Sequence, residues 1–212
     1  MQAPTVGQVC GAQIQQSIFA DPCCLALRIH GPVQFSKFFG PELTRGDNIA
    51  AVWDALPRML KMFDTYDVKV TFATVGFLFA SNKEELLAFS PDQKPAYTQS
   101  ILSPYNGHFD LVKKNEQEDP YHFASKLVDL IAQYPDQEIA THTFSHYYCL
   151  ENGQTLEDFR RDIAAAVEIA KHKGVVLKSL VFPRNQFNED YLEVCKEFGI
   201  TSYRGNESAW FH

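Results

Sequence analysis

Two histidines stand four residues apart in the run His142-Thr-Phe-Ser-His146, where the short strand-like segment 138–142 ends. On one helical turn, two imidazole rings at that spacing point to the same side and can bind one divalent metal ion. The spacing alone is a weak signal, and its alternative is a pair of partly buried histidines hydrogen-bonded to the backbone. The position favours the metal site, because α/β folds place their ligands at the carboxyl ends of strands.

Four further residues have types that could serve such a site, each with an ordinary alternative. Arg184 follows an apolar run, where an arginine tends to face the site, although a surface salt bridge would also explain it. His30 follows another apolar run and is either a further metal ligand or a strand-end histidine without metal. Cys149 is either a thiolate ligand or a buried inert thiol, which the apolar context favours. Trp210 could stack on a sugar ring or pack at the end of the chain.

The elements that must position these residues alternate between strand-like and helix-like patterns. Apolar, β-branched runs predict five strands, at 25–29, 68–75, 138–142, 177–182 and 200–204. Capping residues and helical periodicity predict helices that start at Asp47, Asn82, Asp119-Pro120, Thr155 and Asn188. Pro57 should kink the first helix or delay its start, and residues 90–118 form a long ordered loop. The order predicts one α/β domain over 1–212, with a mostly parallel sheet or an open (β/α) barrel.

Composition restricts the class of protein. With 45% hydrophobic and 13% aromatic residues among 212, the chain should fold rather than remain disordered. A formal net charge of −7 argues against a nucleic-acid or anionic-membrane partner, and no run is long enough to span a membrane. There is no secretory signal, and the five scattered cysteines are typical of reduced thiols, so we expect a cytoplasmic protein. The sequence does not predict an oligomeric state.

Several motifs together resemble the metal-dependent polysaccharide deacetylase (NodB-homology) family. Residues 138–146 are similar to its His-(Ser/Thr)-x-x-His motif, and Lys69-Val-Thr-Phe-Ala-Thr-Val-Gly76 is similar to its second strand. Phe182-Pro-Arg-Asn-Gln186 and Tyr203-Arg-Gly205 resemble a subgroup associated with bacterial surface-sugar gene clusters. The resemblance runs from about 47 to 205, whereas 1–46 diverge. It implies an incomplete, distorted (β/α) barrel of this family.

The resemblance also implies a function and roles for particular residues. His142 and His146 would bind a divalent metal, zinc above all, and Arg184 would orient the general base. Asn185 and Trp210 would contact the substrate, an acetylated sugar. The expected reaction is deacetylation of an N-acetylated sugar or polysaccharide precursor.

The sequence departs from the family at two places. Where the family has the paired aspartates that supply a metal ligand and the general base, this chain reads Ala26-Leu-Arg-Ile-His-Gly-Pro32, without a carboxylate. His30 could replace the ligand but not the base, and the nearest carboxylates, such as Asp47, would need an unusual path. The family's C-terminal Leu-x-His is missing, so we expect a shortened barrel. The alternative function is therefore a degenerate, non-catalytic domain that serves in sugar binding or interaction.

Overall fold

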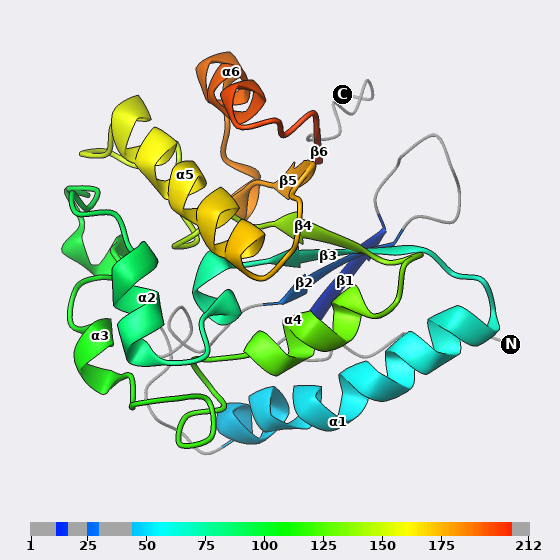
Figure 1. Cartoon of the computed structure of the whole chain (residues 1–212). Coiled ribbons are helices and arrows are strands. Elements are labelled where there is room, and N and C mark those ends of the chain that lie inside the picture. The colour runs from blue at the N-terminus through cyan, green and yellow to red at the C-terminus, as the bar shows by residue number, and fades with distance from the viewer. Residues whose placement is uncertain (1–11, 17–24, 30–43, 205–212) are drawn as a thin grey trace, which may run out of the picture.

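A computed structural model describes residues 12–16, 25–29 and 44–204 of the chain, with the backbone alone for 12–16, 25–29 and 44–50. A six-stranded sheet with its strands in chain order forms its centre (Figure 1). The first two strands pair antiparallel, and every later neighbouring pair is parallel. The strands are β1 (Ala12–Gln16), β2 (Leu25–Ile29), β3 (Val70–Thr74), β4 (Glu138–Thr141), β5 (Ser179–Val181) and β6 (Ser202–Arg204).

The five predicted strands are confirmed as β2 to β6, and the mostly parallel sheet is confirmed with them. Among the described residues the sheet is open rather than closed into a barrel. The register pairs Ile29 with Thr74, Thr74 with Thr141, and Thr141 with Leu180. The ends of these strands therefore lie at one edge. Strand β1 was not predicted, because Ala-Gln-Ile-Gln-Gln holds too few apolar residues to signal a strand.

Helices connect the strands, and most of the predicted caps are present. The side chain of Asn82 accepts from Glu85 N at 2.8 Å, and Thr155 forms a capping box with Asp158. Asn188 caps the last helix. The helices are α1 (Thr44–Thr65), α2 (Lys83–Phe89), α3 (His108–Leu111), α4 (Ser125–Ala132), α5 (Leu156–His172) and α6 (Glu189–Glu197), with 3₁₀ turns η2 (Gly76–Phe79), η3 (Ser100–Leu102) and η4 (Pro183–Asn185).

Two predicted helix starts were wrong. Helix α1 begins at Thr44, so Asp47 lies inside the helix rather than at its start, and the helix contains Pro57, so the late start does not occur. Burial of Leu56 and Leu60 on either side stabilises the helix through the proline. Asp119 does not open a helix, and α4 begins only at Ser125. The carboxylate of Asp119 instead closes a turn: it accepts from Lys113 N at 2.9 Å and lies 2.8 Å from His122 Nδ1.

The sheet packs the helices against one face and presents small side chains on the other. Phe72 and Ile139 belong to the main core with residues of α1, α4 and α5, and Leu180 belongs to a second core with residues of α5 and α6. Their strand neighbours Ala73 and Ala140 point to the opposite face. Figure 1 shows α1, α4, α5 and α6 following one another along the sheet, from the bottom of the view to the top.

Candidate active site

His142 is the first residue beyond β4, and two neighbouring strands fix its position. Its backbone N–H donates to Thr74 O at 2.9 Å, and its buried ring lies with Nδ1 2.6 Å from Val181 O at the end of β5. A carbonyl can only accept, so Nδ1 carries the proton and Nε2 carries the lone pair that can bind a metal. A ring N–H held by a carbonyl is the usual support of a metal-binding histidine.

His146 returns to His142 at the end of the connecting loop. The two ring centres lie 4.7 Å apart, with an interplanar angle of 78°. With metal–nitrogen bonds of about 2.1 Å, and ring centres about 1.1 Å beyond the nitrogens, two imidazoles on one tetrahedral ion have centres about 5 Å apart. The pair therefore fits as two ligands of a zinc-like ion. Both side chains are buried, which limits competition from bulk water.

Backbone strain is concentrated at this edge of the sheet. Thr143, His146, Arg184 and Asn185 have φ of 64°, 58°, 53° and 56°, in the left-handed region that L residues rarely adopt. Elsewhere in the described segments only Asp67 has a positive φ among non-glycine residues. Such conformations cost on the order of 1–3 kcal/mol each and persist where the surroundings enforce them, often at functional sites.

A buried carboxylate holds the loop that joins the two histidines. Asp162 lies on α5 and is 2% exposed. It accepts from Phe144 N at 2.7 Å, from Ser145 N at 3.1 Å and from the hydroxyl of Ser145. Burial raises the pKa of Asp162 to about 6, against the opposing effect of these hydrogen bonds. Sequence reasoning missed this residue, although a charge three positions after Phe159, on the apolar face of α5, was a signal.

A close backbone approach holds the other side of the loop. Gly76 N donates to Thr143 O at 2.9 Å, and Phe77 N donates to Phe144 O at 3.1 Å. A Cβ on Gly76 would lie 2.7 Å from the Cα of Phe144, far inside van der Waals contact. Glycine is therefore required here by contact between two backbones rather than by a positive φ.

Arg184 lies in η4, directly after β5 and beside residues 142–146, which are called the histidine loop below. Its guanidinium lies 4.2 Å from the ring centre of Tyr148, which in turn packs edge-on against His146 at 5.2 Å. Glu151 lies 3.4 Å from Arg184 Nη1 and also accepts from Gln186 at 2.9 Å. Tyr148 therefore links Arg184 to the histidine pair, and sequence reasoning identified neither Tyr148 nor Glu151; the predicted role of Arg184 in orienting the base stays a prediction.

Asn185 connects two of the motifs. Its side-chain oxygen accepts from Arg204 Nη2 at 2.7 Å, so the strand ends of β5 and β6 are joined. Burial lowers the pKa of Arg204. The predicted contact of Asn185 with substrate stays a prediction.

The family model of polysaccharide deacetylases matches residues 47–203. The chain belongs to the polysaccharide deacetylase family. Curated proteins give no match. Among solved structures, a protein named as a polysaccharide deacetylase from Mycobacterium smegmatis is 17% identical, with a TM-score of 0.50, over 94% of this chain and 54% of that one.

Two further structures are similar at lower scores. A family 4 carbohydrate esterase from Streptomyces lividans is 12% identical, with a TM-score of 0.43, over 69% of this chain and 54% of that one. A CE4 family pseudoenzyme from Bacillus anthracis is 14% identical, with a TM-score of 0.43, over 71% of this chain and 38% of that one. This chain therefore spans between four tenths and just over half of the length of these structures.

Several predicted residues of this deacetylase-family site lie outside the described residues or outside the site. His30 and Trp210 fall in segments that the structure does not describe. Among the described residues, no third His, Cys, Asp or Glu joins the histidine pair to complete a set of metal ligands. Cys149 is buried in the second core, and burial raises the pKa of its thiol, as expected of an inert cysteine.

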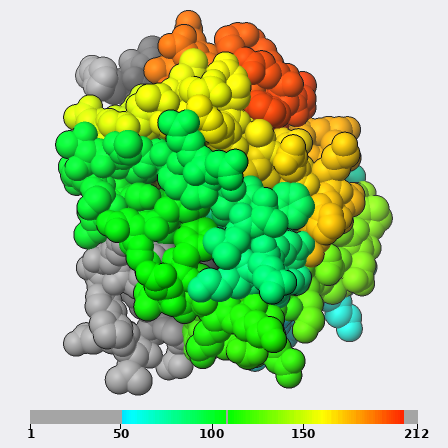
Figure 2. All heavy atoms as spheres, turned by 60° about the vertical axis from the view of Figure 1, so that its left-hand side comes forward, coloured from blue at the N-terminus to red at the C-terminus, as the bar shows by residue number. Residues whose placement is uncertain are grey.

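The long segment between α2 and α4 packs against the candidate site. The hydroxyl of Tyr97 accepts from Tyr148 N at 2.9 Å, and Thr98 N donates to Asn152 O at 2.8 Å. Phe77 packs edge-on against both Tyr105 and Phe144. Figure 2 shows this segment, in green, covering much of the surface beside the start of α5, in yellow. The segment is not a loop throughout, because it contains η3 and α3, and it contacts Tyr148 directly and Phe144 through Phe77.

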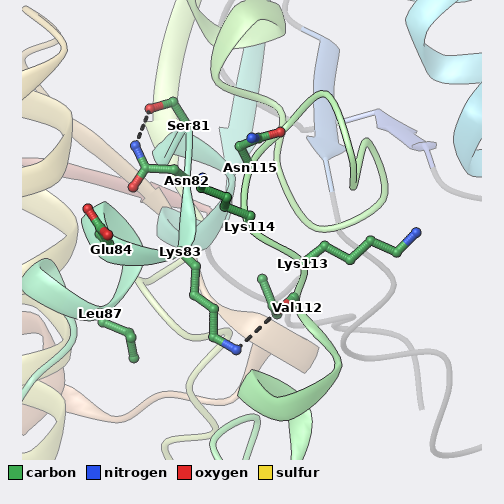
Figure 3. Close-up of a pocket in the computed structure, with 9 residues that line it drawn as sticks. All are labelled: Ser81, Asn82, Lys83, Glu84, Leu87, Val112, Lys113, Lys114 and Asn115. Atoms are coloured by element: carbon green, nitrogen blue, oxygen red, sulfur yellow. Dashed lines mark hydrogen bonds between the residues drawn. The ribbon is translucent and has the colours of Figure 1, made fainter.

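A separate pocket of about 690 Å³ opens between the start of α2 and the segment after α3 (Figure 3). Two of the residues that line it are joined by a hydrogen bond from Lys83 Nζ to Val112 O at 3.2 Å. None of the site residues named above lines it. The lining residues are Ser81, Asn82, Lys83, Glu84, Leu87, Val112, Lys113, Lys114 and Asn115.

The described part of the chain holds no helix with the length and hydropathy to span a bilayer.

Proposed function

We propose that this chain binds a divalent metal ion, zinc by the chemistry of its donors, through His142 and His146, and removes acetyl groups from an N-acetylated sugar or polysaccharide precursor. One observation carries the proposal: two buried imidazoles 4.7 Å apart at the strand ends, one of them oriented by Val181 O. Imidazole nitrogen is a preferred zinc ligand. Membership of the deacetylase family supports the substrate class.

When bound, such an ion polarises an amide carbonyl and activates a water molecule. The residues of this chain prepare for that chemistry. Val181 O keeps the Nε2 lone pair of His142 directed into the site, and the burial of both rings excludes bulk water. Arg184, stacked on Tyr148, places a positive charge beside the pair, where it can orient an acidic group or a substrate oxygen.

A specific observation favours a second function, that of a degenerate deacetylase domain that binds a sugar or a protein without turnover. Strand β2 ends level with Thr74, where the family's first motif belongs, and its residues Leu-Ala-Leu-Arg-Ile hold no carboxylate. Without a general base the reaction would be slower by about 10² to 10⁴.

Metal analysis of protein purified without added metal, followed by an acetate-release assay on an N-acetylglucosamine oligomer, separates these functions. The proposal expects about one ion per chain, lost in His142→Ala and in His146→Ala. His172→Ala is the matched control, because this histidine lies on α5 with its side chain 60% exposed, away from the pair. Metal with acetate release supports the deacetylase, and metal without it supports the degenerate domain. Unchanged metal content in His146→Ala would contradict both forms of the metal site. A cytoplasmic location is part of the proposal, and fractionation of cells would test it.

A further inference from the structure

Asp162 is buried at a place where the packing of α5 does not require a charge. Its neighbours on the same face of the helix are Phe159 and Ala166, three residues before and four residues after it, and both are buried. Burying a carboxylate is unfavourable unless hydrogen bonds replace its water. The donors that do so are Phe144 N, Ser145 N and the hydroxyl of Ser145, all in the loop between the two histidines.

We infer that Asp162 is the positioning residue of the metal pair: its carboxylate fixes the backbone between His142 and His146, so that both rings are held together before an ion binds. The inference rests on the proposed metal site. The hydrogen bonds of Asp162 go to Phe144 and Ser145, so the role that we infer for it is exerted through the loop.

The loop needs such a holder because its conformation is strained. Thr143 and His146, which flank the two residues bound by Asp162, both have left-handed φ values. The amide of Tyr147 is held as well, by Thr143 Oγ1 at 2.7 Å, which closes the turn around His146. Hydrogen bonds to an ionised acceptor are stronger than neutral ones. Three of them on two adjacent residues can therefore hold a turn that would otherwise relax and carry His146 away from His142.

The alternative is that Asp162 merely ties α5 to the sheet. In that case its removal would lower stability without a selective effect on the loop. Amide exchange and metal affinity distinguish the two roles, because a remote core substitution of equal cost changes stability but leaves the loop in place. Leu60→Ala provides that control: Leu60 is fully buried on α1, a helix that packs on α4.

The experiment compares Asp162→Asn, Asp162→Ala and Ser145→Ala with Leu60→Ala in the full chain. Site-resolved hydrogen exchange of the Phe144 and Ser145 amides is measured without metal, and zinc affinity by competition with a chelator. Outer-shell partners of metal ligands typically contribute about 10- to 100-fold in affinity. We expect losses of that size in Asp162→Ala and smaller ones in Asp162→Asn and Ser145→Ala. The loop amides should exchange faster than the rest of the core in all three.

Equal zinc affinity in Asp162→Asn and the native chain would overturn the inference, as would a loss in Leu60→Ala as large as that in Asp162→Asn. A native chain that binds no zinc would contradict the proposed function instead. The exchange experiment still decides the inference in that case. Loop amides that exchange faster only in the Asp162 and Ser145 variants support it, and unchanged exchange refutes it. If Asp162→Ala fails to fold, Asp162→Asn and Ser145→Ala provide the same comparison.

Discussion

Gly76→Ala should separate metal binding from folding more sharply than a change at either histidine. The added Cβ would lie 2.5 Å from Cδ2 and 2.7 Å from Cα of Phe144, where ordinary contact begins at 3.4 Å. The ring can turn away, but the Cα belongs to the backbone of the histidine loop. The loop must therefore move by roughly 0.7 Å, the difference between the two distances.

A shift of that size exceeds what the site can absorb. Metal–ligand distances are held to within about 0.2 Å of their ordinary values. Movement of Phe144 would also stretch the hydrogen bonds Gly76 N–Thr143 O and Phe77 N–Phe144 O, now 2.9 and 3.1 Å long. Inserting a methyl group into packed structure usually costs about 1–3 kcal/mol of stability. We expect a folded variant whose affinity for zinc or cobalt is about 10- to 100-fold weaker, which is the usual effect of losing a residue that holds a metal ligand in place.

The assay pairs guanidinium unfolding with chelator competition. Gly174→Ala is the control, because its φ of 75° strains any side chain but nothing lies within 4 Å of the new Cβ. That variant should lose about 1 kcal/mol of stability and retain its metal affinity. Native affinity in Gly76→Ala would refute the reasoning, and so would equal losses of affinity in both variants.

Three further predictions concern charge and chemistry. Burial raises the pKa of Asp162 from 3.8 to about 6, so the free energy of unfolding should fall as the pH rises through that window, by on the order of 3 kcal/mol from this group. Asp162→Asn should therefore cost less stability at about pH 7 than at about pH 4, and an equal cost at both would contradict the shift. Ile29→Asp, at the last residue of β2, combined with His30→Asp should raise acetate release from an N-acetylglucosamine oligomer by about 10² or more if the first motif aligns there; no gain would place the base elsewhere. Cys149, buried with a raised pKa, should react with a thiol reagent only on unfolding, and rapid labelling of the native chain would show that its burial is incomplete.

The strands were predictable because β-branched and apolar residues favour a buried strand: residues 68–75 are rich in them, and Ile139 and Ala140 form the centre of the short segment 138–142. The start of α4 was wrong for a local reason. The same side chain that favours an N-cap also favours a turn, and Asp119 is used in a turn with His122. Local preference alone cannot choose between these two uses.

The histidine pair was predictable because its members are close in sequence, and Arg184 because it follows a strand. The residues that hold the pair were not. Asp162 lies 17 and 18 positions from the residues it binds, and Tyr97 lies 51 positions from Tyr148. No spacing rule connects them, and only the packing of α5 and of the long segment brings them together.

The residues that hold the histidine loop in place indicate whether this site still has a function. Gly76, Asp162 and Val181 come from three different elements and converge on five residues. Two of those five residues are strained and their anchor is a buried charge, so an apolar, relaxed loop would give a more stable fold. Residues and backbone conformations that lower the stability of the fold are expected at sites where function requires them. The loop is built to hold two imidazoles, whereas β2 lacks the carboxylates of catalysis. The proposed metal binding can therefore be tested separately from turnover, and it rests on the two imidazoles held 4.7 Å apart.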